Sequence, residues 1–121
     1  MENLDLKCAE LGSGLAQVDG VREQTFTDVL SVLEEQGLYA AFLYLKYLKA
    51  REGEVGRRVS DRCAAFLREL HLLEDGDLWK ALQKLGEDLD RLLFARDLLR
   101  QALVYGRYHA KARQPAGGGS L

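Results

Sequence analysis

Proline is confined to a single position, Pro115, near the end of this 121-residue chain. Because a proline ring removes a backbone donor and clashes with the preceding helical turn, its absence from residues 1–114 allows long unbroken helices. Leucine dominates the apolar residues and isoleucine is absent, which favours helices over strands. The sequence therefore predicts an all-α protein.

Apolar residues recur at helical spacing in six segments. The expected helices cover residues 4–18, 26–36, 38–50, 55–70, 78–85 and 88–111. Thr25 and the acidic turn at 74–77 are predicted N-caps, and Gly37 is a predicted helix end. The 38–50 segment carries no charge before Lys46, so we expect this helix to be central.

Length and composition indicate one folded domain. Hydrophobic residues make up 47% of the chain and charged residues 30%, a balance typical of a globular protein. No internal repeat of 20 to 50 residues is present, which argues against a solenoid. We expect a compact bundle of five or six helices over residues 1–113 and a flexible glycine-rich tail over residues 114–121.

Residues able to carry catalysis or bind a metal do not form a known motif. His71 and His109 lie in separate predicted segments without metal-ligand spacing, so no metal or other cofactor is expected. The LGSGL segment at 11–15 lacks the lysine and hydroxyl residue that end a phosphate-binding loop. Acidic clusters at 74–77 and 87–90 fall at predicted helix N-termini, where they oppose the helix dipole. We expect no catalytic residues, and a protein that is not an enzyme.

The N-terminus lacks the pattern of a signal peptide, and no apolar run of about 18 residues is long enough to span a membrane. We therefore expect a cytoplasmic protein with no membrane partner. Cys8 and Cys63 lack CxxC partners and could form a disulfide, a redox pair or two buried thiols. Buried thiols are expected, because disulfides are rare in the cytoplasm.

Charge is distributed unevenly, although the formal net charge is only −2. Residues 91–121 contain six basic residues against Asp97 alone, a net charge of +5, so residues 1–90 carry −7. At 100° per residue, four of these cations fall within an arc of about 60° on the last predicted helix: Arg96, Arg100, Arg107 and Lys111. A second basic cluster surrounds the joint between the third and fourth predicted helices: Lys46, Lys49, Arg51, Arg57, Arg58 and Arg62.

These basic regions have two interpretations. Clustered cations can bind phosphate and displace condensed counterions, or they can simply form a solvated surface. Tyrosines accompany both regions, at Tyr39, Tyr44, Tyr47, Tyr105 and Tyr108. Their rings could stack on the bases of single-stranded nucleic acid, or they could wedge between helices with the hydroxyls at the surface.

Three segments together carry a family resemblance. Residues 32–50 read VLEEQGLYAAFLYLKYLKA, in which the matching positions are Gly37, Leu38, Ala40, Ala41 and Phe42. Residues 102–112 read ALVYGRYHAKA, in which the matching positions are Tyr105, Arg107, Ala110 and Ala112. With the early stretch LKCAELGSGLAQV at 6–18, the chain resembles the small all-helical subunit of the type III-B CRISPR effector, the Cmr complex. The family usually has a tryptophan where Tyr105 stands, and residues 92–99 are richer in leucine here.

This resemblance implies a subunit of an antiviral ribonucleoprotein that does not itself cut RNA. Copies of the chain would stack as a minor filament, with other effector subunits and the guide/target RNA backbone as partners and no small-molecule substrate. The candidate RNA-binding residues are then Lys46, Lys49, Arg57, Arg58, Arg62, Arg96, Arg100, Arg107 and Lys111. The alternatives are the small subunit of the type III-A complex and a protein-only helical adaptor or oligomer without nucleic-acid contact.

Overall fold

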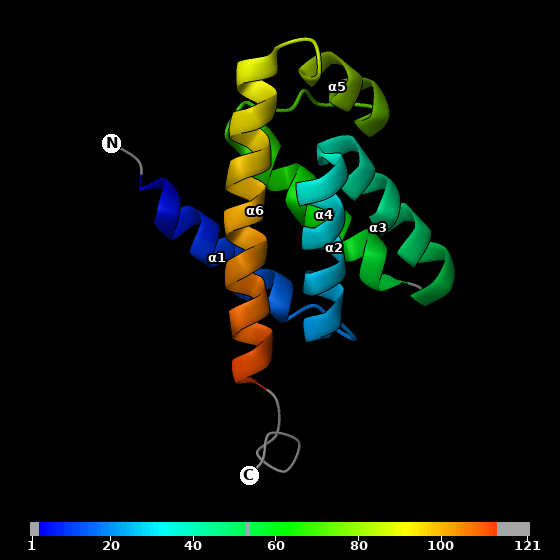
Figure 1. Ribbon diagram of the computed structural model, residues 1–121, viewed down its shortest axis with the longest axis vertical. Coiled ribbons are helices and arrows are strands. Elements are labelled where there is room, and N and C mark those ends of the chain that lie inside the picture. Colours follow the sequence, from blue (N-terminus) through cyan, green and yellow to red (C-terminus); the bar gives the residue numbers. More distant parts are fainter. Residues whose placement is uncertain (1–2, 53, 114–121) are drawn as a thin grey trace.

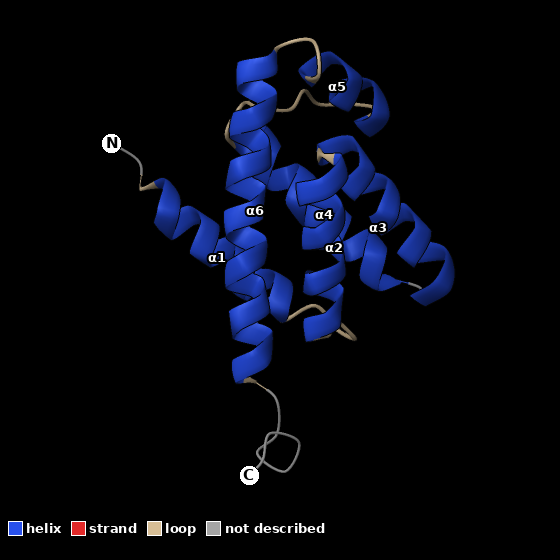
Figure 2. Cartoon of the chain, in the orientation of Figure 1, coloured by secondary structure: helices blue, strands red, loops and turns tan. Residues whose placement is uncertain are grey.

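The computed structural model describes residues 3–52 and 54–113, and this part of the chain contains six helices and no strand (Figures 1 and 2). The helices are α1 (Leu4–Ala16), α2 (Glu23–Gln36), α3 (Leu38–Glu52), α4 (Glu54–Glu69), α5 (Leu78–Leu85) and α6 (Leu89–Ala112). The predicted all-α bundle is therefore confirmed. The tail predicted over residues 114–121 lies outside the described residues.

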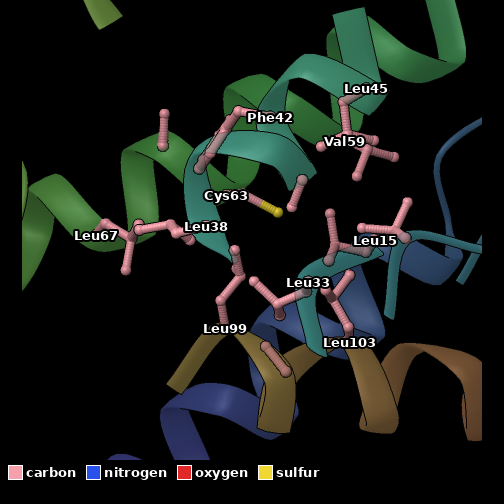
Figure 3. Close-up of a cluster of buried hydrophobic side chains, with 14 of the residues drawn as sticks. Leu15, Leu33, Leu38, Phe42, Leu45, Val59, Cys63, Leu67, Leu99 and Leu103 are labelled. Carbon is pink, nitrogen blue, oxygen red and sulfur yellow. The ribbon is translucent and has the colours of Figure 1, made fainter. Parts of the chain in front are cut away.

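The 24-residue helix α6 forms the long axis of the bundle (Figure 1). Helices α1 and α2 both pack on α6, while α3 packs on α2 and α4. The short helix α5 lies beside the start of α6 and also contacts α3. All six helices contribute residues to the buried core. Figure 3 shows part of it, where Cys63 of α4 lies among leucines and Phe42 of α3.

Helix ends follow the local sequence, with one exception. Asp77 and Asp88 cap α5 and α6, since their carboxylates accept hydrogen bonds from the backbone N–H of the third residue beyond them, at 2.9 and 3.2 Å. Gly37 ends α2 with a φ of 104°. The prediction that Thr25 is an N-cap was wrong. Arg22 is the N-cap, and the Thr25 hydroxyl reaches back to accept from the Arg22 N–H at 3.3 Å.

Helix α3 lies at the edge of the bundle rather than at its centre (Figure 1). One side packs inward through Leu38, Phe42 and Leu45. On the opposite side, Tyr39 and Tyr47 are 41% and 52% exposed. The prediction of a central helix was wrong, because a lack of charge on every side does not distinguish a fully surrounded helix from one with an exposed apolar side.

Two glycines allow the helices around α6 to approach closely. A Cβ atom on Gly12 of α1 would lie 2.6 Å from the carbonyl oxygen of Ala102 and 2.7 Å from the backbone nitrogen of Gly106, both in α6. A Cβ atom on Gly106 would in turn collide with the ring of Phe26 in α2. The glycines of the 11–15 segment therefore belong to a helix, where Gly12 serves packing.

Candidate nucleic-acid interface

The basic residues predicted on the last helix lie along one side of α6, next to α2. Arg100, Arg107 and Lys111 are exposed, and Arg96 is half-buried. We call these four residues the α6 basic side. Arg96 and Arg100 line a shallow depression together with Glu34 of α2. The helix is continuous from Leu89 to Ala112, so the cations share one rigid support.

Three residues of the α6 basic side have a carboxylate neighbour. Arg100 Nη1 lies 3.9 Å from Glu34 Oε2, and Arg107 Nε lies 3.7 Å from Glu23 Oε2, both in α2. Arg96 Nη2 lies 3.5 Å from Asp97 Oδ1. Exposed ion pairs contribute only about 0–1 kcal/mol each, so a phosphate can compete for these guanidinium groups. Lys111 has no carboxylate within 4 Å among the residues that the structure describes.

The second basic cluster does not form one surface. Arg57 lies between two carboxylates of its own helix, at 2.6 Å from Glu54 and 3.0 Å from Asp61. The hydrogen bond to Glu54 and the charges of both acids raise the pKa of Arg57. Two carboxylates of its own helix therefore offset the positive charge of Arg57.

The remaining members of that cluster point to different neighbours. Lys46 Nζ lies 5.3 Å from the ring centroid of Trp79 in α5. Arg62 borders α1, and Arg58 is exposed one turn before it in α4. The Lys49 side chain lies outside the described part of the chain. The structure thus places Lys46 at α5 and Arg62 at α1, whereas Arg58 and Arg62 stay one turn apart in α4.

A groove between α1 and α4 is a feature that the sequence did not indicate. It has a volume of about 300 Å³, with Leu11 and Phe66 among its apolar lining residues. An ion pair between Lys7 and Glu69 crosses it, with Nζ and Oε1 3.6 Å apart. Charges of both signs line this groove, so it does not favour an anion over a cation.

The tyrosines divide into two groups. The Tyr105 hydroxyl donates to Asp5 Oδ1 at 2.7 Å, which lowers the pKa of Asp5 and raises the pKa of Tyr105. The Tyr44 hydroxyl donates to Asp28 at 3.3 Å. These two side chains join helices within the bundle. The rings of Tyr39, Tyr47 and Tyr108 are exposed.

Both cysteines are free thiols buried in the core, as predicted. Within residues 3–52 and 54–113, no group of three or more histidine, cysteine or carboxylate side chains is placed to hold a metal ion. No helix in that same part of the chain is long and apolar enough to cross a membrane.

Because both cysteines are buried, we expect their thiols to react slowly in the native protein. Loss of hydration raises the pKa of Cys63 to about 12 and also raises the pKa of Cys8. We expect neither thiol to react with a water-soluble disulfide reagent in the native protein at neutral pH, and both to react in denaturant. Absorbance of the released thiolate measures this. Rapid labelling of one cysteine in the native state would show that it is accessible.

Comparisons with known proteins return no match to a protein family, to a curated protein or to a solved structure. The exposed cations of α6 and the exposed apolar side of α3 are therefore the features from which a function can be inferred.

Proposed function

We propose that the chain is a non-catalytic small subunit of a type III-B CRISPR RNA-guided effector complex. It stacks with further copies as a minor filament and helps to hold the guide/target RNA. The observation that carries this proposal is the α6 basic side, a row of exposed or half-exposed cations on one continuous helix. The sequence resemblance of residues 6–18, 32–50 and 102–112 supports the same class of protein.

Phosphate contacts suit the geometry of these cations. Arg100 and Arg107 are each 47% exposed at the side chain, and their carboxylate partners lie at the long end of ion-pair distances. The carboxylates of α2 hold the two guanidinium groups near the surface without burying them. Such contacts are independent of RNA sequence, which is sufficient where base pairing with a guide supplies specificity.

The net charge of −2 makes a single copy a weak RNA ligand. Stacked copies would repeat the α6 basic side along a filament, and repeated contacts on one RNA strand reinforce each other through effective concentration. We therefore expect RNA holding to be a property of the assembled complex rather than of the isolated chain.

The test is charge reversal on the α6 basic side: Arg100→Glu, Arg107→Glu and Lys111→Glu combined in the assembled effector. We expect target RNA to dissociate at least about tenfold faster, because three phosphate contacts become repulsive. The dependence of log affinity on log salt should also become shallower, by about 2 for three lost contacts on a single strand. RNA dissociation measured across a salt series gives both quantities.

The matched control is Lys84→Glu, an exposed lysine of α5 that lies outside the α6 basic side. This variant should leave RNA dissociation unchanged. Equal RNA retention in the triple variant and the wild type, with both complexes fully assembled, would contradict RNA holding by α6.

A protein-only helical adaptor or oligomer is the second candidate, and the exposed apolar side of α3 favours it. An apolar interface is insensitive to salt, whereas phosphate contacts weaken steeply as salt is added. The type III-A small subunit would present the same kind of surface. The neighbouring reading frames separate the two CRISPR types, because effector subunits are encoded together.

A further inference from the structure

Two exposed apolar surfaces lie on different helices of the bundle. The first, which we call the α3 apolar stripe, consists of Tyr39, Leu43 and Tyr47, which are 41%, 47% and 52% exposed. Because they are four residues apart, they follow one side of the helix over about 12 Å. The second, the α6 apolar patch, consists of Leu89, Leu93 and Phe94 in the first turns of α6, which are 65%, 38% and 46% exposed.

Positive charge borders the α3 apolar stripe at Lys46. Trp79 of α5 extends the stripe, with its ring centroid 5.4 Å from that of Tyr39 in an edge-on arrangement. Lys46 lies over the Trp79 ring, and Lys80 follows Trp79 in sequence. Neither lysine has a carboxylate within 4 Å in the part of the chain that the structure describes. This surface combines the residue types that dominate binding energy at protein interfaces with two unneutralised cations.

Acidic residues outnumber basic residues around the α6 apolar patch. Asp90 and Asp97 lie three residues before and four residues after Leu93, so they adjoin it along the same side of the helix. Both are exposed, as is Glu87 just before the helix. Arg96, three residues after Leu93, also adjoins the patch and offsets Asp97, since Nη2 and Oδ1 are 3.5 Å apart. Asp90 has no basic side chain within 4 Å among the described residues. The charges without an ion-pair partner beside the two surfaces are therefore of opposite sign, with Lys46 beside the α3 apolar stripe and Asp90 beside the α6 apolar patch.

We infer that the α3 apolar stripe of one copy of this chain docks on the α6 apolar patch of a second copy. The inference rests on the proposed stacking function and specifies the contact that builds the stack. In this arrangement Lys46 and Lys80 of one copy approach Asp90 and Asp97 of the next, and both apolar surfaces are covered at once.

Contacts between like surfaces are less favourable. Two α3 apolar stripes placed face to face would bring the lysines of both copies together, and two α6 apolar patches would bring the aspartates together. Like charges brought together at an interface disfavour the pairing. Each of these symmetric contacts would also close at a dimer and leave the other apolar surface exposed to water.

The docking of unlike surfaces leaves a docked pair with one free α3 apolar stripe and one free α6 apolar patch, so the assembly extends instead of closing. Arg96 lies beside such a contact, but Arg107 and Lys111 remain available, because they lie 14 and 18 residues after Leu93, about 21 and 27 Å along the helix. Stacking and RNA holding can therefore occur together.

Two complementary variants test this contact with the full chain. Leu43→Asp disables the α3 apolar stripe, and Leu93→Asp disables the α6 apolar patch. Both positions are exposed, so the fold should persist, and circular dichroism with thermal unfolding checks this. Sedimentation velocity over a rising concentration series then measures assembly of the wild type, of each variant and of their equimolar mixture.

We expect the wild type to form a series of oligomers and each variant alone to remain monomeric. The mixture should form a 1:1 dimer and nothing larger, because only one competent contact can form between the two variants. Dimers of Leu93→Asp alone would instead indicate an α3–α3 contact, and dimers of Leu43→Asp alone an α6–α6 contact. Either result, or a mixture without heterodimer, overturns the inference.

Disulfide cross-linking between copies detects the same contact even when it is too weak to measure by sedimentation. Cys8 and Cys63 are both buried, so cysteines introduced by Leu43→Cys and Leu93→Cys would be the exposed thiols. Mild oxidation of the two single variants together should give mostly the mixed disulfide, whereas each oxidised alone should stay largely monomeric. Equal yields of mixed and same-variant disulfides would indicate random collision and overturn the inference.

Leu6→Asp is the matched control, since Leu6 is 54% exposed on α1, outside both surfaces, and its replacement should leave assembly intact. The stacking and RNA-holding proposals fail independently. If the two variants fail to form the 1:1 dimer while charge reversal on α6 still speeds RNA dissociation, only the proposed contact is overturned. If the two variants form the 1:1 dimer but charge reversal on α6 leaves RNA dissociation unchanged, only the RNA-holding role is overturned.

Discussion

Replacing Gly12 with alanine is expected to lower the free energy of unfolding by about 2 kcal/mol. The added methyl group would meet the Ala102 carbonyl oxygen and the Tyr105 Cβ at 2.6 Å, and the Gly106 nitrogen at 2.7 Å. These are backbone atoms or atoms fixed to the backbone, so α1 and α6 must move apart. Overpacking of this kind costs about 1–3 kcal/mol or more, and the better helix propensity of alanine returns at most about 1 kcal/mol.

Gly14→Ala supplies a matched control in the same helix. There the new methyl group would meet only the terminal Nη1 of Arg62 at 3.3 Å, and a flexible side chain can move aside. Helix propensity should therefore dominate and raise the free energy of unfolding by up to about 1 kcal/mol. Chemical denaturation of the two variants measures the difference. Equal stabilities for both would show that α1 and α6 are not in close contact at Gly12.

The helices could be predicted from the sequence because their signals are local. Apolar spacing defined each segment, and Asp77, Asp88 and Gly37 occupy the cap positions that their chemistry favours. Thr25 shows the limit of that reasoning. A hydroxyl residue near a helix start can serve as the N-cap or, three residues later, reach back to the N-cap nitrogen, and the sequence pattern does not separate these roles.

The candidate interface could be predicted only in part. The arc of cations on α6 follows from helical periodicity alone. Glu23 and Glu34, which pair with two of those cations, come from α2, and the packing of α2 on α6 is a tertiary feature. The exposed side of α3 was missed for the same reason, because the side that a uniformly apolar helix buries depends on its neighbours.

The second basic cluster was predicted from closeness in sequence, and closeness in sequence did not place its cations together. Lys46 and Arg62 are close to the same joint in sequence, yet Lys46 lies over Trp79 of α5 whereas Arg62 borders α1. Two helices leave a joint in different directions, and their side chains diverge within a turn or two. The cations of α6 keep a fixed spacing because they share one helix, whereas cations on two helices form one surface only where packing brings them together.

Gly106→Ala and Phe26→Leu should each destabilise the protein yet compensate each other when combined. A methyl group on Gly106 would collide with the Phe26 ring, which is buried in the core at 1% exposure. We expect Gly106→Ala to lower the free energy of unfolding by about 2–3 kcal/mol. Phe26→Leu should lower it by about 1 kcal/mol through lost packing, while creating room at that point.

The double variant should be about as stable as Phe26→Leu alone, because the leucine removes the collision and alanine is the better helix former. That outcome corresponds to a coupling of about 2 kcal/mol between the two positions, within the range for residues in direct contact. Denaturant unfolding of all four proteins measures the coupling, and additive losses would contradict the contact.

Phe26 and Gly106 set the spacing of α2 and α6, and the same spacing places Glu23 Oε2 3.7 Å from Arg107 Nε. A variant that widens the spacing between α2 and α6 should therefore also move Glu23 away from Arg107. The Arg107 side chain would then be held less firmly at the surface proposed to bind RNA.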